Sequence, residues 1–176
     1  MSDKYVILLR GINVNPATKV AMSDLRDLVT ALGYTEVKTI LQSGNVILES
    51  SAVPDAAGLN AAIVSKTGVR SRVVVLSLAA IEAIARENPL LGVSDDLSKL
   101  TITFLESPID PATLTRPSDE ELAPEQLVIT PSAIYQWCPD GILASKLKPA
   151  WWKQLGPLVT ARNVRTVNRI LAAAES

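Results

Sequence analysis

The chain has 176 residues, 48% of them hydrophobic, and a net charge of −1, so it is long enough to bury a core and is not expected to be disordered. It contains no histidine, which excludes serine–histidine triads and zinc hydrolysis because histidine is the usual general base and zinc ligand. No apolar run approaches the roughly 20 residues of a membrane-spanning helix, and Cys138 is the single cysteine, so we expect a cytoplasmic protein without an intramolecular disulfide.

The first 77 residues alternate between strand patterns and helix patterns. Apolar residues at a helical period, such as Leu25, Val29 and Leu32, give the first predicted helix an inner face. The order β-α-β-β-α-β predicts an α+β, ferredoxin-like half, in which two helices cover one face of a four-stranded antiparallel sheet. The predicted strands are residues 4–10, 37–41, 45–50 and 71–77, and the predicted helices are residues 23–32 and 55–67.

Residues 78–99 are predicted to connect this half to a second one, through a helix at 78–88 that stops at Pro89 and a loop. Residues 100–176 repeat the first half more loosely, and no sequence in them matches the strand at 71–77. We therefore expect two tandem ferredoxin-like halves, the second incomplete or modified. Its predicted strands are 100–107, 126–130 and 133–138, and its helices begin after Pro111 and span 146–155 and 161–173.

Two polar motifs are predicted to meet at one end of the first sheet. The strand order of such a half, 4-1-3-2, places "RGIN" (10–13) and "QSGN" (42–45) beside the N-terminus of the first helix. Arg10 offers a planar set of donors for a carboxylate or phosphate, and Gly11 and Gly44 let a ligand approach backbone amides. We therefore predict a small anionic ligand at this end. Four further residues are candidates for orienting it: Asn13, Gln42, Ser43 and Asn45.

The same residues also have a structural interpretation. Gly44-Asn45 is ordinary hairpin chemistry, and Arg10 could form an ion pair with a carboxylate such as Glu49 or Asp24. Spacing alone supports the functional and the structural interpretation about equally.

The C-terminal part of the chain is basic, because residues 141–176 hold six basic side chains and only one acidic one, Glu175. Such asymmetry favours an anionic partner, although basic helix faces are commonly just solvated. Thr160 is predicted to cap the last helix, with Arg162 and Asn163 in its exposed first turn. Because a basic residue there opposes the helix dipole, Arg162 is a further candidate for ligand binding, together with Asn163 beside it. A capped helix with a basic solvent face is the alternative.

Four segments together resemble the bacterial family named for domain of unknown function 1697. They are "ILLRGINV" (7–14), "MSDLRDLVTALGYTEVKTILQSGNV" (22–46), "ARENP" (85–89) and "TARNVRTV" (160–167). The resemblance spans nearly the whole chain and implies two ferredoxin-like halves in tandem, but no established activity or cofactor. The chain departs from the family at Val164 and Arg165, where relatives usually have tryptophan and asparagine.

Three functions are open at this point: binding of a small anionic ligand, a noncatalytic interaction or oligomerisation role, and nucleic-acid binding. A homodimer through Trp151 or Trp152 is one form of the second. The third is disfavoured because the predicted strands lack interleaved aromatics and the pI is about 5.5. No general base can be named, so no catalytic residue is assigned. The acidic residues show no metal-ligand spacing, and we predict neither a metal site nor a cofactor.

Overall fold

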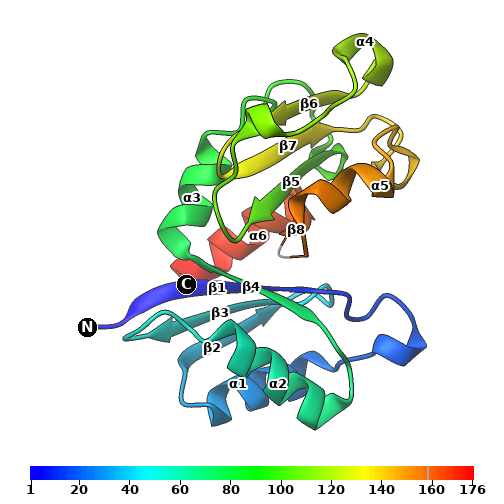
Figure 1. Ribbon diagram of the computed structural model, residues 1–176. Coiled ribbons are helices and arrows are strands. Elements are labelled where there is room, and N and C mark those ends of the chain that lie inside the picture. Colours follow the sequence, from blue (N-terminus) through cyan, green and yellow to red (C-terminus); the bar gives the residue numbers. More distant parts are fainter. Residues whose placement is uncertain (158) are drawn as a thin grey trace. The chain divides into compact units, whose positions relative to one another are not determined.

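The computed structural model describes residues 1–157 and 159–176, which divide into two units (Figure 1). The first unit contains Met1–Ile81 and Arg169–Ser176, and the second contains Glu82–Asn168. Each holds one four-stranded antiparallel sheet. The chain is therefore an α+β protein, as its sequence predicts. Within the described residues, no helix combines the length and the apolar character that crossing a membrane requires.

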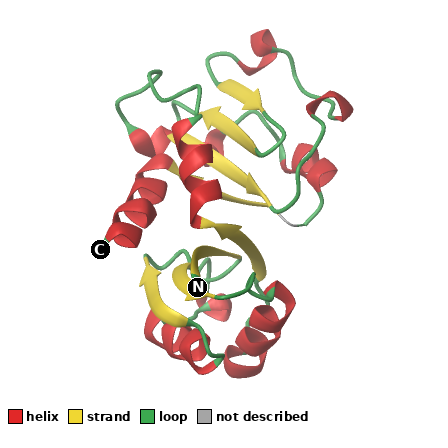
Figure 2. Cartoon of the chain, turned by 90° about the vertical axis from the view of Figure 1, so that its left-hand side faces the viewer, coloured by secondary structure: helices red, strands yellow, loops and turns green. Residues whose placement is uncertain are grey.

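The sheet of the first unit has the strand order β2-β3-β1-β4, which is the predicted order 4-1-3-2. The helices α1 and α2 lie on the same side of this sheet (Figures 1 and 2). The elements are β1 (Asp3–Arg10), α1 (Met22–Ala31), β2 (Thr35–Ile40), β3 (Asn45–Ser50), α2 (Ala56–Thr67) and β4 (Arg72–Ser77).

The central strand β1 is buried on both faces. Tyr5, Ile7 and Leu9 belong to the core beneath the helices, together with Leu25 of α1 and Leu59 of α2. The intervening residues of β1 are also buried, which explains the uninterrupted apolar run. Because side chains alternate along a strand, the last residue of β1, Arg10, projects from the face opposite α1 and α2.

The second unit repeats this strand order as β6-β7-β5-β8. Its helices between the strands are much shorter than α1 and α2. Its elements are α3 (Leu78–Arg86), which begins in the first unit, β5 (Leu100–Leu105), α4 (Asp119–Leu122), β6 (Gln126–Ile129), β7 (Ala133–Trp137), α5 (Pro149–Trp152), β8 (Val159–Asn163) and α6 (Val164–Glu175), which ends in the first unit.

The fourth strand that the sequence did not reveal is β8. It pairs with β5, with Thr160 opposite Phe104 and Arg162 opposite Ile102. The prediction that Thr160 caps the last helix is therefore wrong, because α6 begins at Val164. No glycine or proline separates β8 from α6, so the helical pattern that begins at Val164 runs directly out of a strand and hides the boundary.

The helices predicted after Pro111 and at 146–155 are reduced to short pieces. The first consists of a single 3-10 turn, Pro111–Thr113, and the four-residue α4. The second consists of the four-residue α5 and the 3-10 turn Lys153–Leu155. Three prolines between residues 108 and 117 remove backbone donors from the first of these segments.

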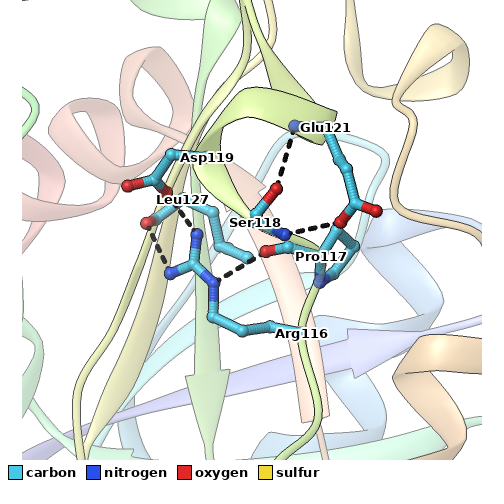
Figure 3. Close-up of polar contacts among 6 residues, drawn as sticks. All are labelled: Arg116, Pro117, Ser118, Asp119, Glu121 and Leu127. Atoms are coloured by element: carbon cyan, nitrogen blue, oxygen red, sulfur yellow. Dashed lines mark hydrogen bonds and ion pairs between the residues drawn. The ribbon is translucent and has the colours of Figure 1, made fainter.

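One arginine fixes the short α4 against the sheet, as Figure 3 shows. Arg116 donates from Nε to the carbonyl oxygen of Pro117 (3.1 Å) and from Nη1 to that of Leu127 (3.2 Å), and its Nη2 pairs with Asp119 Oδ1 at 2.5 Å. Ser118 and Glu121 form a reciprocal capping box at the helix start. Side-chain contacts thus hold in place a helix that is too short to be stable by itself.

Candidate functional site

The structure brings the RGIN and QSGN motifs together through the side chain of Asn13. Its Nδ2 donates to the carbonyl oxygens of Gln42 (2.7 Å) and Val20 (3.0 Å), and its Oδ1 accepts from the Val20 amide (2.8 Å). Asn13 itself has a positive φ of 54°, which asparagine tolerates better than most residues. The amide therefore acts as a bridge that fastens the loop after β1 to the turn before β3.

The second motif closes on itself in a similar way. Asn45 is 0% exposed, and its Nδ2 donates to the Ile40 carbonyl oxygen (2.8 Å) and to Ser43 Oγ (2.9 Å). Asn45 is thereby held beneath the turn, while Gln42 and Ser43 are exposed on its surface.

Both the backbone conformation at position 44 and the close packing around it require a glycine. Its φ is +89°, and a Cβ at this position would lie 2.6 Å from Ile12 Cδ1 and 2.8 Å from Leu9 Cβ. Its carbonyl oxygen accepts from the Leu9 amide at 2.9 Å. The glycine thus lets the turn pack directly on the end of β1. Gly11 has a similar φ of +87°, but open space surrounds the place of its missing Cβ.

Arg10 and Gly11 line an open depression of about 420 Å³ together with Arg70, Ser71 and Arg72, which we call the arginine depression. Arg10 and Arg72 are directly opposite each other in the antiparallel β1–β4 pair, so both side chains project from the same face. The three arginines are exposed, whereas Ser71 is only 5% exposed. Three arginines therefore line one surface hollow, and the described residues of its lining include no acidic one.

The electrostatics of this hollow favour an anion. Arg10 and Arg72 bring two positive charges to directly opposite positions of the β1–β4 pair. A guanidinium presents a planar fork of N–H donors that matches the oxygens of a carboxylate or phosphate. An anion in the hollow would accept hydrogen bonds of this kind.

Arg70 and Arg72 were missed by the sequence analysis. The signal was present, because in the strand order 4-1-3-2 the start of strand 4 lies beside the end of strand 1. The basic pair in "VRSRV" (69–73) therefore had to lie beside Arg10. Gly68 ends α2 in the left-handed conformation, with φ 72°, and turns the chain so that Arg70 reaches the hollow.

Arg162 and Asn163 belong to the second unit, and neither is among the residues that line the arginine depression. The predicted exposure of Arg162 is wrong: it is 8% exposed. It lies in β8, where its Nη1 donates to Thr160 Oγ1 and to the Ala161 carbonyl oxygen, both at 2.8 Å. Burial lowers the pKa of its guanidinium to about 10. Asn163 caps α6, since its Oδ1 accepts from the Thr166 amide (2.9 Å).

Cys138 is buried at the end of β7. Desolvation, with a smaller effect of the Glu125 carboxylate, raises the pKa of its thiol to about 11. Since the thiolate is the reactive form, Cys138 is poorly suited to act as a nucleophile. Within the described part of the chain, no group of three or more cysteine, aspartate or glutamate side chains is placed to hold a metal ion.

Comparisons with known proteins agree with the fold and add no activity. The model of the family described as "Protein of unknown function (DUF1697)" matches residues 2–135. No curated protein sequence matches the chain. A solved structure, that of the conserved bacterial protein SP0830 from Streptococcus pneumoniae, is similar with a TM-score of 0.69 and 24% sequence identity over 98% of this chain and 99% of that chain. At this identity the similarity shows the fold alone.

Proposed function

This chain belongs to the DUF1697 family, whose description assigns no activity, and we propose that it binds a small anionic ligand in the arginine depression of the first unit. The observation that carries this proposal is the convergence of Arg10, Arg70 and Arg72 on one hollow, with Arg10 and Arg72 directly opposite each other. Gly11 supports it, because a backbone without a Cβ at the rim leaves room for a ligand.

Among the residues that the sequence analysis selected, we assign ligand contacts to Arg10 and Gly11. The remaining residues of the two motifs would position this end of the sheet: Asn13 and Asn45 through their hydrogen bonds, and Gly44 through its close packing on Leu9 and Ile12. The proposal does not include Arg162 and Asn163, because neither is among the residues that line the arginine depression.

A noncatalytic interaction or oligomerisation protein is the second candidate. The specific observation in its favour is that the Asn13 and Asn45 side chains are engaged in structural hydrogen bonds. Under this alternative the motifs would maintain the fold, and the arginines would contact an acidic surface of another protein.

We also propose that the two units are ferredoxin-like halves of a tandem. Support comes from their common strand order and from the position of α1 and α2 between strands of the first unit. The single buried cysteine fits the cytoplasmic location that the sequence predicts.

Thermal unfolding with and without anions tests the proposed site. At constant ionic strength, inorganic phosphate or pyrophosphate at 100 times its dissociation constant should stabilise the native chain by about 2.7 kcal/mol. The double variant Arg10→Gln/Arg72→Gln should lose most of this increase. Arg26→Gln is the matched control, because Arg26 is exposed on α1 away from the hollow. An equal increase for the double variant and the control would contradict the proposal.

A further inference from the structure

A second depression adjoins the arginine depression. It has a volume of about 530 Å³ and lies along α2, and we call it the α2 depression. Arg70 and Ser71 line both depressions. The two hollows therefore adjoin each other at Arg70 and Ser71 on the surface of the first unit. The residues that belong to the α2 depression alone are Asn60, Ala61, Val64 and Ser65.

The helix geometry explains how these residues gather. Leu59 and Ile63 of α2 are buried in the core of the first unit. The positions one residue later, Asn60 and Val64, lie together on the adjacent flank, because residues four apart share one side of a helix. The helix ends at Gly68, after which the chain returns along this flank.

One hydrogen bond fixes the junction of the two depressions. Ser71 Oγ donates to Asn60 Oδ1 at 3.4 Å, and Ser71 is 95% buried, given its exposure of 5%. The contact joins the start of β4 to α2. It holds the segment that carries Arg70 and Arg72 at a defined distance from the helix, so the relation between the two hollows is built into the fold.

We infer that the ligand is a phosphomonoester, with its phosphate in the arginine depression and its organic group along α2. This inference rests on the proposed anion site. A phosphomonoester carries about −1.5 to −2 charges at pH 7 and three acceptor oxygens, which suits three arginines better than the single charge of one carboxylate. Arg70 would contact the phosphate from the side that faces the organic group.

The lining of the α2 depression indicates the chemistry of that organic group. Asn60 and Ser65 supply an amide and a hydroxyl, whereas Ala61 and Val64 supply aliphatic surface. A mixed lining of this kind fits a group that carries hydroxyls and also has C–H faces, such as a sugar or a nucleoside. Among the described residues of this lining, Arg70 at the shared boundary is the one with a charged side chain.

Isothermal titration calorimetry with three probes tests the inference: inorganic phosphate, ribose 5-phosphate and adenosine 5′-monophosphate. We expect at least one of the two esters to bind the native chain about tenfold more tightly than phosphate, equivalent to about 1.4 kcal/mol. Tighter binding of both esters would identify the sugar as the recognised group, and tighter binding of the nucleotide alone would identify the nucleoside. Either result supports the inference.

Variants on α2 give the test its specificity. Ala61→Gln/Val64→Gln places longer, uncharged side chains in the α2 depression. In this double variant the esters should bind no more tightly than phosphate, and the dissociation constant of phosphate should stay unchanged. Ala57→Gln is the matched control, because Ala57 is exposed one turn earlier on α2 and does not line the hollow.

The outcomes separate this inference from the proposed function. If phosphate binds and both esters bind no more tightly, the inference is wrong and the anion site stands. If the ester keeps its advantage in the double variant, the organic group does not lie along α2, and the inference is again wrong. If none of the three probes binds, the anion site fails and the inference fails with it.

Discussion

The side-chain amide of Asn13 donates to the backbone carbonyl oxygen of Gln42 over 2.7 Å and joins two motifs that are 29 residues apart in sequence. The contact uses the side chain of one residue and only the backbone of the other. The two polar residues therefore have different roles, although each belongs to a conspicuous motif at the same end of the sheet.

Replacement of Asn13 by alanine should destabilise the chain. The substitution removes three hydrogen bonds and leaves the Val20 amide without its side-chain acceptor, which should lower the free energy of unfolding by about 1–3 kcal/mol. Gln42→Ala is the control and should change it by less than about 0.5 kcal/mol, because surface substitutions of this kind have small effects. Urea denaturation measures both, and an equal loss for the two variants would refute the distinction.

Alanine substitutions should show that position 11 has room for a Cβ and position 44 does not. In Gly44→Ala the new methyl group would lie within 3 Å of both Leu9 and Ile12, so packing strain adds to the cost of the left-handed backbone. Gly11→Ala carries the backbone cost alone, about 1–2 kcal/mol. We expect Gly44→Ala to lower the melting temperature clearly more than Gly11→Ala does. The opposite order would show that the turn can move away from β1.

The first unit could be predicted from sequence because its signals are local. Strand and helix periods are clear, Gly33 and Gly68 mark the helix ends, and the strand order follows from the order of elements. The meeting of the RGIN and QSGN motifs then followed from topology. Arg70 and Arg72 could have been found by the same argument, because they precede the strand that pairs with the end of β1.

The second unit could be predicted less well because its structure depends on contacts between distant residues. β8 is a strand because it pairs with β5, 54 to 62 residues earlier in the register from Leu105↔Val159 to Thr101↔Asn163. The segment at Thr160 to Asn163 has no local feature that separates it from the helix after it. The burial of Arg162 could not be foreseen either, since its place in a strand was not predicted.

The position of Asn163 at the start of α6 gives a third prediction. Asn163 Oδ1 accepts from the Thr166 amide, so Asn163→Ala should cost about 0.5–2 kcal/mol, the usual loss for an N-cap residue. Asn163→Asp should retain most of the stability, because aspartate is an equally good cap. Guanidinium denaturation provides the comparison. Equal loss in both variants would show that the side chain has a role other than capping.

The buried thiol of Cys138 should make the free energy of unfolding depend on pH in the alkaline range. The pKa of Cys138 rises from 9.0 to about 11 on folding, mainly through desolvation. The folded chain therefore keeps a proton that the unfolded chain releases, so the contribution of Cys138 is complete below pH 9 and is lost as the pH rises toward 11. Burial also raises the pKa of Tyr135, to about 12, so its contribution to stability is likewise lost at higher pH.

The variant Cys138→Ala should therefore show a shallower loss of unfolding free energy between pH 9 and pH 11 than the native chain. The native thiol should also react with iodoacetamide at pH 8 far more slowly than the thiol of the chain in urea. Rapid alkylation of the folded chain would contradict both the burial and the direction of the pKa shift.

The most direct measurement of the central claim is an NMR titration of the ¹⁵N-labelled chain with inorganic phosphate at constant ionic strength, with spectra of the backbone amides and the arginine Nε–H groups. The largest shift changes should occur at Arg10, Gly11 and residues 70–72, and should saturate with a single dissociation constant. Changes confined to the basic residues after position 141, or changes that grow without saturation, would show that the arginine depression is not an anion site.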